Sequence, residues 1–313
     1  MLNSFVIAFE AVVPMFILVG IGMLVRRSSL ISKEENRKLN KMAFKVFFSA
    51  LMFNSTYSNG VDKAINYRLM LYGIIAVLIV YVLTTIFVLR VEPSNPTRGS
   101  LIQAIYRSNF VLMGLPIVSS ISGASELAST ALMIAVVIPI NNILAILTLE
   151  YYGGGKAKLK DMLIKLAKNP MLEGAVLGIL SLVLGVKLPF FLEKLVSDMA
   201  SVATPLTLVI LGISFEFSQI KECGRNLTYA VVGRLIVVPA LVLGVAALMG
   251  FRDADFVTLI AIFAAPSAIA SYTMAENMNC DGVLAGNSLI VSSLFSSITM
   301  FFWIFLFKSL GMF

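Results

Sequence analysis

Histidine is absent from this chain of 313 residues, and cysteine occurs only twice, at Cys223 and Cys280. The missing imidazoles exclude histidine metal sites, haem ligation by histidine and histidine proton relays. The two cysteines are far apart and form no CxxC pair, so we expect reduced thiols on the inner side of the membrane. Charged residues make up only 13% of the chain, whereas roughly 25% is typical of a soluble domain. These shortages indicate a membrane protein without a cofactor.

Long apolar stretches occupy much of the remaining sequence, because 59% of the residues are hydrophobic. A membrane-spanning helix needs roughly 20 mainly apolar residues. Ten spans are predicted, near residues 5–25, 39–58, 69–89, 101–121, 127–151, 171–186, 195–217, 227–249, 256–277 and 283–307. Lys41 and Lys45 enter the second stretch, for which a long interfacial helix is the alternative; we expect a span whose lysines reach the surface.

The net charge of +7 is distributed unevenly along the chain. If the first residue lies outside and ten spans follow, most lysines and arginines fall in the inner loops. The positive-inside rule then predicts a multi-pass protein of the cell membrane with both termini extracytoplasmic. The basic surplus is a topology signal and a contact for anionic lipid of the bilayer, so we expect no nucleic-acid partner. No basic segment precedes the first apolar stretch, so we expect no cleavable signal peptide.

The longest polar connection, residues 153–169, contains three consecutive glycines and five lysines. We interpret it as a cytoplasmic linker between a first five-helix repeat, residues 1–152, and a second one, residues 170–313. An odd number of spans gives the halves opposite orientations, which is the inverted-repeat arrangement of many secondary transporters. The predicted fold is therefore all-α, with ten transmembrane helices in a five-plus-five inverted repeat. The sequence has no GxxxxGK[ST] loop, which disfavours a pump with its own nucleotide site.

Prolines interrupt the fourth and ninth stretches. The run NFVLMGLPIV contains Asn109, Gly114 and Pro116, and the run IFAAPSAIAS contains Pro266 and Ser267. Proline breaks the helical hydrogen-bond ladder, and a broken helix in lipid is tolerated only where it faces protein or a wet cavity. Matching breaks in two halves indicate a binding site near the midplane, with broken, crossing fourth and ninth helices. Free N–H groups at the half-helix ends favour an anion there.

Several polar residues are candidates for contact with substrate, each with a structural alternative. Asn109 can bind a carboxylate or cap the break, and Ser267 can bind ligand or satisfy the broken ladder. Tyr272 lines the cavity or belongs to an interfacial aromatic belt. Asn54 and Asn142, in the second and fifth stretches, are further candidates, although polar residues in spans commonly serve helix packing.

Charged residues inside the stretches are costly and usually have a partner or a role. Glu10, Glu173 and Arg234 are candidates for coupling or for balancing the substrate charge, and a structural ion pair is the alternative. A desolvated carboxylate can titrate, which is the minimum requirement for proton coupling. Glu216 and Glu276 lie near the inner ends of their stretches, where we expect them to be solvated.

Five runs of the sequence stand in a characteristic order and spacing over nearly the whole chain. They read AVVPMFILVGIGMLVRR, LNKMAFKVFFSALMFNS, SNFVLMGLPI, KNPMLEGAVLGI and AAPSAIASYTMAENMNCDGVLAG. Together they resemble the auxin efflux carrier family, which includes plant PIN-type auxin exporters and bacterial malate and malonate permeases. The short central loop is similar to that of the prokaryotic members.

The resemblance implies a substrate site at crossed fourth and ninth helices, a scaffold domain that moves against a transport domain, and often a homodimer. By this likeness Asn109 and Pro116 match the crossing of the fourth helix. Pro266 and Ser267 match that of the ninth, and Asn54 falls where the second helix approaches the site.

These observations predict a secondary active transporter, that is a carrier or permease, for small organic anions such as dicarboxylates or auxin-like carboxylates. Efflux is a candidate direction of transport. The transporter is expected to work by alternating access, with protons or sodium as candidate coupling ions and a second copy as partner. A membrane receptor or sensor of a small organic acid without transport is the alternative. We expect no enzyme, because histidine and clustered carboxylates are both lacking.

Overall fold

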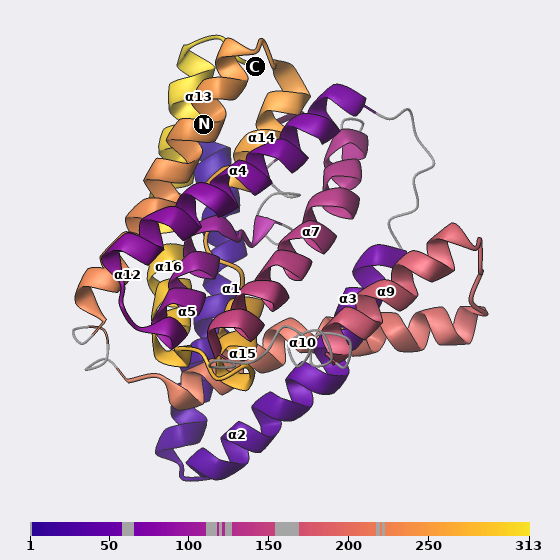
Figure 1. Cartoon of the computed structure of the whole chain (residues 1–313), viewed down its shortest axis with the longest axis vertical. Coiled ribbons are helices and arrows are strands. Elements are labelled where there is room, and N and C mark those ends of the chain that lie inside the picture. Colours follow the sequence, from indigo (N-terminus) through magenta and orange to yellow (C-terminus); the bar gives the residue numbers. More distant parts are fainter. Residues whose placement is uncertain are drawn as a thin grey trace.

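The computed structural model describes residues 2–57, 66–110, 118, 121–122, 127–153, 169–216, 220 and 223–313. Within these residues every regular element is helical, and the only strand-like pairing is one isolated bridge (Figure 1). The all-α prediction is thereby confirmed. Three predicted site residues fall outside the description: Gly114 and Pro116 entirely, and Glu10 in its side chain.

The helices follow the predicted stretches. In the first half they are α1 (Leu2–Arg27), α2 (Lys33–Met42), the π-helical turn η1 (Ala43–Phe47), α3 (Phe48–Tyr57), α4 (Tyr67–Val91), α5 (Asn95–Tyr106) and α7 (Leu127–Gly153). In the second half they are α9 (Pro170–Val183), α10 (Phe190–Ser214), α12 (Gly224–Val232), the π-helical turn η3 (Gly233–Val237), α13 (Val238–Leu248), α14 (Asp253–Ala264), α15 (Ala270–Asn277) and α16 (Gly282–Ser309).

The second stretch begins earlier than its apolar pattern predicts. A capping box between Ser32 and Glu35 starts α2, with each residue's side chain bonded to the other's backbone N–H. From there α2, η1 and α3 run on without a gap in the helix. Lys41 and Lys45 are exposed on this long helix, which keeps both ammonium groups out of the packed interior.

Five helices among the described residues are long and apolar enough to cross a membrane. They comprise Tyr67–Val91, Val136–Gly153, Phe190–Ser214, Gly224–Leu248 and Gly282–Ser309. The first of them exposes a row of apolar side chains at helical spacing, which includes Leu71, Ile75, Leu78, Val82 and Ile86. Such a surface indicates contact with lipid. The chain is therefore a multi-pass membrane protein, whereas the ten-span inverted repeat stays a prediction.

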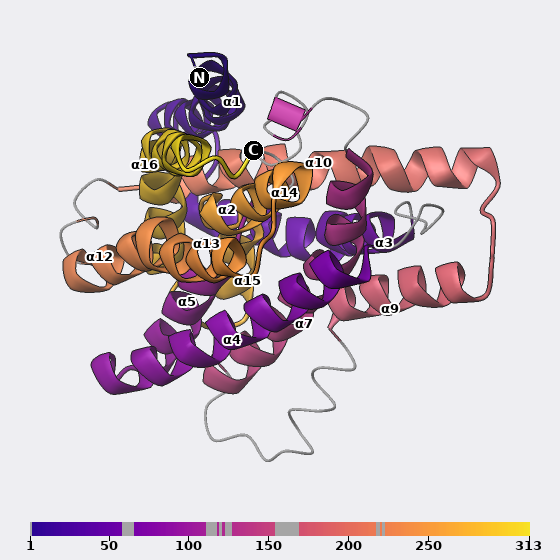
Figure 2. The same cartoon turned by 90° about the horizontal axis from the view of Figure 1, so that it is seen from above.

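Packing divides the helices into two groups. The paired group consists of α1, α2, α3, α9 and α10, in which α1 packs on α10 and α3 packs on α9. Gly22 of α1 and Gly212 of α10 approach so closely that a Cβ on either would collide with the backbone of the other helix, and Gly174 of α9 approaches Ser49 of α3 in the same way. The crossing group consists of α4, α5, α7 and α12 to α16. Figure 2 shows α3, α9 and α10 side by side, to one side of the crossing group.

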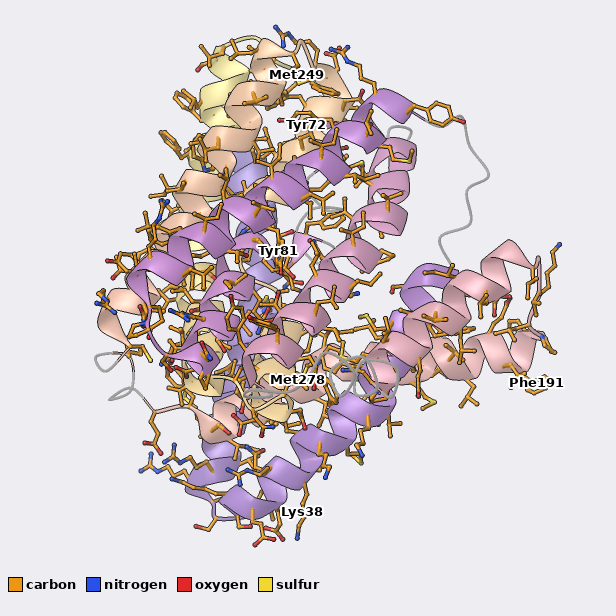
Figure 3. The ribbon with its side chains drawn as sticks, in the orientation of Figure 1. Lys38, Tyr72, Tyr81, Phe191, Met249 and Met278 are labelled. Carbon is orange, nitrogen blue, oxygen red and sulfur yellow. The ribbon has the colours of Figure 1, made fainter. Side chains whose placement is uncertain are left out.

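The two ends of the molecule differ in the segments that they carry. α1 begins and α16 ends at the same end (Figure 1). Lys38 of α2 lies at the opposite end from Met249, which follows α13 (Figure 3). The two ends of the described chain therefore lie at the same end of the molecule.

Candidate functional site

Two helices of the crossing group stop in the interior of the molecule. α5 ends at Tyr106 and α14 ends at Ala264, and each is followed by extended backbone. Pro266 lies just beyond α14, where it lacks the N–H that a continuing helix needs. Pro116 lies outside the described residues, and α5 stops well before it. The end of α5 therefore has a cause other than this proline.

Arg234, in the turn η3, binds the carbonyl ends of both interrupted helices. Its fully buried guanidinium donates to five backbone carbonyls: those of Ile105 and Tyr106 in α5, at 3.4 and 3.0 Å, and those of Ile262, Phe263 and Ala265 at the end of α14, at 3.1, 2.5 and 2.8 Å. The last carbonyls of a helix have no partner within it, and a cation is favourable at that negative end. Arg234 therefore stabilises both interruptions at once.

The segments that follow the two interruptions run antiparallel to each other. Ser108 and Ser267 form the isolated bridge, and the Asn109 N–H donates to the Pro266 carbonyl at 2.8 Å. We call residues 107–109 and 265–269 the crossing. One segment comes from each half of the sequence, so the crossing joins the two halves.

A cavity of about 600 Å³ lies beside the crossing, and we call it the central cavity. This volume is within the roughly 300–1,000 Å³ that is typical of small-molecule sites. Its walls come from the crossing, α3, α7 and α10. The lining residues are Phe48, Leu51, Met52, Asn54, Ser55, Arg107, Ser108, Asn109, Phe110, Ile134, Ile138, Asn141, Asn142, Ser197, Ala200, Ser201, Thr204, Pro205, Ala268, Ile269 and Ala270.

Arg107 is the one charged residue among the described residues that line the central cavity. Its side chain is buried, with 4% of the residue exposed. The guanidinium donates to the Asn142 Oδ1 and, at 2.9 Å, to the sulfur of Met274, while the Asn142 amide donates to the sulfur of Met52. In the part of the chain that the structure describes, no carboxylate pairs with Arg107. Within the described part of the chain, the positive charge of Arg107 on the cavity wall therefore has no carboxylate to balance it.

Asn109 adds a second donor to the same wall. Its Nδ2 atom is buried and has no hydrogen-bond partner among the described residues, although its backbone N–H is bonded across the crossing. A buried polar atom without a partner is costly, so this position favours a ligand or a water molecule that accepts a hydrogen bond.

The structure brings three of the predicted substrate contacts together and places others elsewhere. Asn54, Asn109 and Asn142 all line the central cavity. Ser267 does not: its hydroxyl donates to the Ala104 carbonyl at 2.8 Å, and its N–H donates to the Ser292 hydroxyl at 3.2 Å. Tyr272 is buried and lines a separate, smaller cavity.

Arg107 is the functional candidate that the sequence reasoning left without a role. The available signal was an arginine inside a stretch predicted to span the membrane, directly before Ser108 and Asn109. Of the acidic candidates, Glu173 is exposed in the first turn of α9. Its role in coupling, like that of Glu10 and Arg234, stays a prediction. The described residues contain no cluster of three metal-ligating side chains.

The remaining walls of the central cavity differ in character. Ser197, Ser201 and Thr204 are spaced by one helical turn along α10 and form a hydroxyl stripe. Apolar side chains from α3 and α7, including Leu51 and Ile138, cover another part of the wall. The cavity therefore combines one cation, amides and hydroxyls with an apolar surface, which suits an amphipathic solute.

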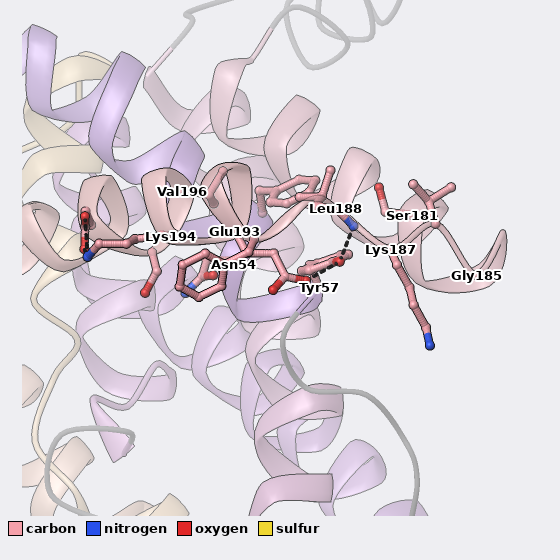
Figure 4. A pocket seen from close by; sticks show the side chains of 14 residues that line it. Asn54, Tyr57, Ser181, Gly185, Lys187, Leu188, Glu193, Lys194 and Val196 are labelled. Carbon is pink, nitrogen blue, oxygen red and sulfur yellow. Dashed lines mark hydrogen bonds and ion pairs between the residues drawn. The ribbon is translucent and has the colours of Figure 1, made fainter.

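A second hollow, of about 820 Å³, lies between α3 and the connection from α9 to α10 (Figure 4). We call it the lateral hollow. Asn54 and Ser197 line both hollows, so the two adjoin at these side chains. The Tyr57 hydroxyl donates to the Glu193 carboxylate at 2.9 Å and accepts from the Leu188 N–H at 2.8 Å (Figure 4). These bonds fix the wall of the lateral hollow.

Comparison with known proteins agrees with a multi-pass membrane protein. Residues 7–304 match the family described as Membrane transport protein. An uncharacterized transporter of Methanocaldococcus jannaschii is 23% identical over 306 residues, which cover 95% of this chain and 98% of the relative. An uncharacterized transporter of Methanothermobacter thermautotrophicus is 22% identical over 300 residues, which cover 94% and 96% of the two chains. The chain therefore belongs to the Membrane transport protein family, that of the auxin efflux carriers.

Proposed function

We propose that this protein is a secondary active carrier of small organic anions, and that the central cavity binds them. The observation that carries the proposal is Arg107, a buried guanidinium that lines the cavity without a described carboxylate partner. A guanidinium matches a carboxylate with two parallel hydrogen bonds, which makes it a strong and specific partner. Asn142 orients Arg107, and Asn109 offers a further donor beside it.

The cavity wall also favours one type of organic anion. A single cation compensates one carboxylate, and the second carboxylate of a dicarboxylate would face neutral amides, hydroxyls or the apolar wall. An apolar body, in contrast, gains from contact with side chains such as Leu51 and Ile138. Within the expected range of substrates, a monocarboxylate with an apolar body is therefore favoured over a small dicarboxylate.

Alternating access requires two groups of helices that move relative to each other, and the packing supports such a division. In a five-plus-five inverted repeat the first helix corresponds to the sixth and the second to the seventh. α1 is the first predicted span and α10 is the seventh. The inverted repeat therefore relates the contact of α1 with α10 to a contact between the sixth span, α9, and the second span, which includes α3. Both contacts are present, with Gly22 and Gly212 at the close approach of α1 and α10 and with Gly174 facing Ser49 at that of α9 and α3. This symmetry of packing supports ten spans and an inverted repeat.

The charge distribution supports the proposed orientation. Arg26 and Arg27 end α1, and Lys33 and Lys38 follow in α2, at the end of the molecule opposite to Met249 (Figure 3). Under the positive-inside rule this end faces the cytoplasm. Both termini are then extracytoplasmic, in a cell membrane, as the loop charges predict.

Uptake into proteoliposomes tests the proposal. Labelled indole-3-acetate, malate and malonate are offered to the purified protein, with and without proton and sodium gradients. We expect saturable uptake, fastest for indole-3-acetate, that Arg107→Met lowers about 100-fold, since loss of a charged partner costs roughly 2–5 kcal/mol. Arg90→Met removes an exposed guanidinium on α4 and serves as the matched control.

Two results would contradict the proposal. Uptake that Arg107→Met leaves unchanged would move the binding site away from the central cavity. Binding of an anion by folded protein without flux in either direction would support the receptor or sensor instead of a carrier.

A further inference from the structure

A second, smaller cavity lies between the paired group and the crossing group, at the α2 end of the molecule. Its volume is about 160 Å³, and its walls come from α2, the end of α10 and α15. We call it the α2–α15 cavity. Among the described residues, none lines both this cavity and the central cavity.

Two asparagines of α2, one helical turn apart, line this cavity with polar atoms that lack partners. Asn36 and Asn40 are 4% and 2% exposed. The Asn36 amide donates to the Ile210 carbonyl at 3.2 Å and to the Ser214 hydroxyl at 2.8 Å. Its Oδ1 atom has no hydrogen-bond partner among the described residues, and neither do the Oδ1 and Nδ2 atoms of Asn40. A buried polar atom without a partner is costly, so these three atoms favour a ligand or water molecules at this position.

Negative charge converges on the same cavity. α10 ends at Ser214 and α15 ends at Asn277, so the negative ends of two helix dipoles meet here. Glu276, in the last turn of α15, adds a carboxylate to the wall. In the described part of the chain no lysine or arginine forms an ion pair with Glu276.

The basic residues that line this cavity do not compensate the negative charge of Glu276. Lys33 is 89% exposed in its side chain and lies 3.5 Å from the carboxylate of Glu216, which Arg26 also binds, at 2.6 Å. Arg37 is exposed to solvent. The positive side chains therefore lie toward the surface, and the buried lining offers mainly oxygen atoms.

We propose that the α2–α15 cavity binds a monovalent alkali cation, with Na⁺ as the best fit, through the Oδ1 atoms of Asn36 and Asn40 and the Glu276 carboxylate. Hard cations prefer oxygen ligands, and helix C-terminal ends are used to coordinate Na⁺ in transporters. One unpaired carboxylate compensates one positive charge, which favours a monovalent ion. The volume leaves room for water molecules that complete the coordination and accept from the Asn40 amide.

Because the site lies between the paired group and the crossing group, the bound cation would also affect how these two groups sit relative to each other. This step rests on the proposed function. Asn36 and Asn40 belong to the paired group, whereas Glu276 belongs to the crossing group. A cation bound by both groups stabilises their contact at the α2 end. Its binding would therefore favour the arrangement in which this end is closed and the central cavity adjoins the lateral hollow.

Cation binding to the purified full-length protein in detergent, without organic anion, tests the site directly. We expect saturable binding of radioactive Na⁺, and a thermal unfolding midpoint that rises by roughly 2–4 °C from choline chloride to sodium chloride at equal ionic strength. Asn40→Ala and Glu276→Gln should each lose this shift. Glu34→Gln, which changes an exposed carboxylate of the same helix α2, should keep it.

The outcomes separate this inference from the proposed function. Equal midpoints in sodium and choline together with absent Na⁺ binding would overturn the cation site and leave the organic-anion carrier standing. A sodium shift that persists in both Asn40→Ala and Glu276→Gln would also overturn it, because binding would then lie elsewhere. If either variant fails to fold, the conservative Asn40→Asp keeps an oxygen ligand, and it should retain Na⁺ binding with an altered affinity.

Discussion

Arg107 lies in the crossing and Arg234 lies beside it; both are buried, but their surroundings differ. Arg234 donates to five backbone carbonyls at two helix ends. Arg107 donates to an amide oxygen and a sulfur, and it lines the central cavity. A guanidinium whose donors are used by the backbone holds the fold together. One that has neutral side-chain partners and faces a cavity is available for a ligand.

The largest expected effect is on the free energy of unfolding, which should depend on Arg234 much more than on Arg107. Arg234→Met should lower the free energy of unfolding by about 3–5 kcal/mol, because several buried carbonyls lose their donor. Arg107→Met should change it by less than about 1 kcal/mol, since it removes a buried charge with few partners. Thermal unfolding and the yield of monodisperse protein measure both. Equal destabilisation by the two substitutions would remove the distinction.

The next effect concerns the geometry of Arg107. Arg107→Lys keeps the positive charge and loses the planar fork that binds a carboxylate through two hydrogen bonds. We expect the KM for the organic anion to rise roughly 10- to 100-fold, with a smaller change in the maximal rate. Concentration-dependent uptake measures this split. An unchanged KM would show that Arg107 acts only as a distant charge.

A smaller effect is expected from the residue that orients Arg107. Asn142→Leu removes the oxygen that accepts from the guanidinium while keeping a similar side-chain volume. We expect a KM increase of about 3- to 10-fold, which is less than the roughly 1.5–3 kcal/mol of a hydrogen bond to a charged group, because Asn142 acts on the substrate only through Arg107. Asn226→Leu, which removes an amide donor to Glu92 away from the cavity, is the control. A KM increase of the same size in the control would assign the effect to general damage.

The smallest effect extends the comparison to an arginine near the surface. Arg26 donates to Glu216 at 2.6 Å and holds the pKa of this carboxyl below its ordinary value of 4.5. The pKa of Glu216 is lower in the folded protein than its ordinary value, so the ion pair with Arg26 stabilises the fold at pH values above the ordinary pKa. This stabilisation is lost as the pH falls through the pKa of the folded protein. Unfolding midpoints measured from about pH 6 downwards should therefore fall less in Glu216→Gln than in the wild type. Identical pH profiles would contradict the prediction.

Most of the described helices could be predicted from the sequence, because apolar stretches and proline breaks are local signals. Asn54, Asn109 and Asn142, which were predicted from polar residues in the apolar stretches, line the central cavity, and their contact with substrate stays a prediction. Pro266 lies where α14 gives way to extended backbone.

The end of α5 at Tyr106 was not foreseen, since it is stabilised by Arg234, a residue distant in sequence. Asn36 and Asn40 were missed for a related reason. They lie in a polar segment at the start of the second stretch, and their burial comes from packing against α10 and α15.

The bridge between Ser108 and Ser267 has a mechanical consequence. The bridge pairs one strand-like segment from each half of the sequence, and Arg234 hydrogen-bonds to the ends of α5 and α14, which lead into these segments. If this paired piece is displaced, both segments move together as one rigid body. Under the proposed function, a solute bound by Arg107 would then move together with its binding site.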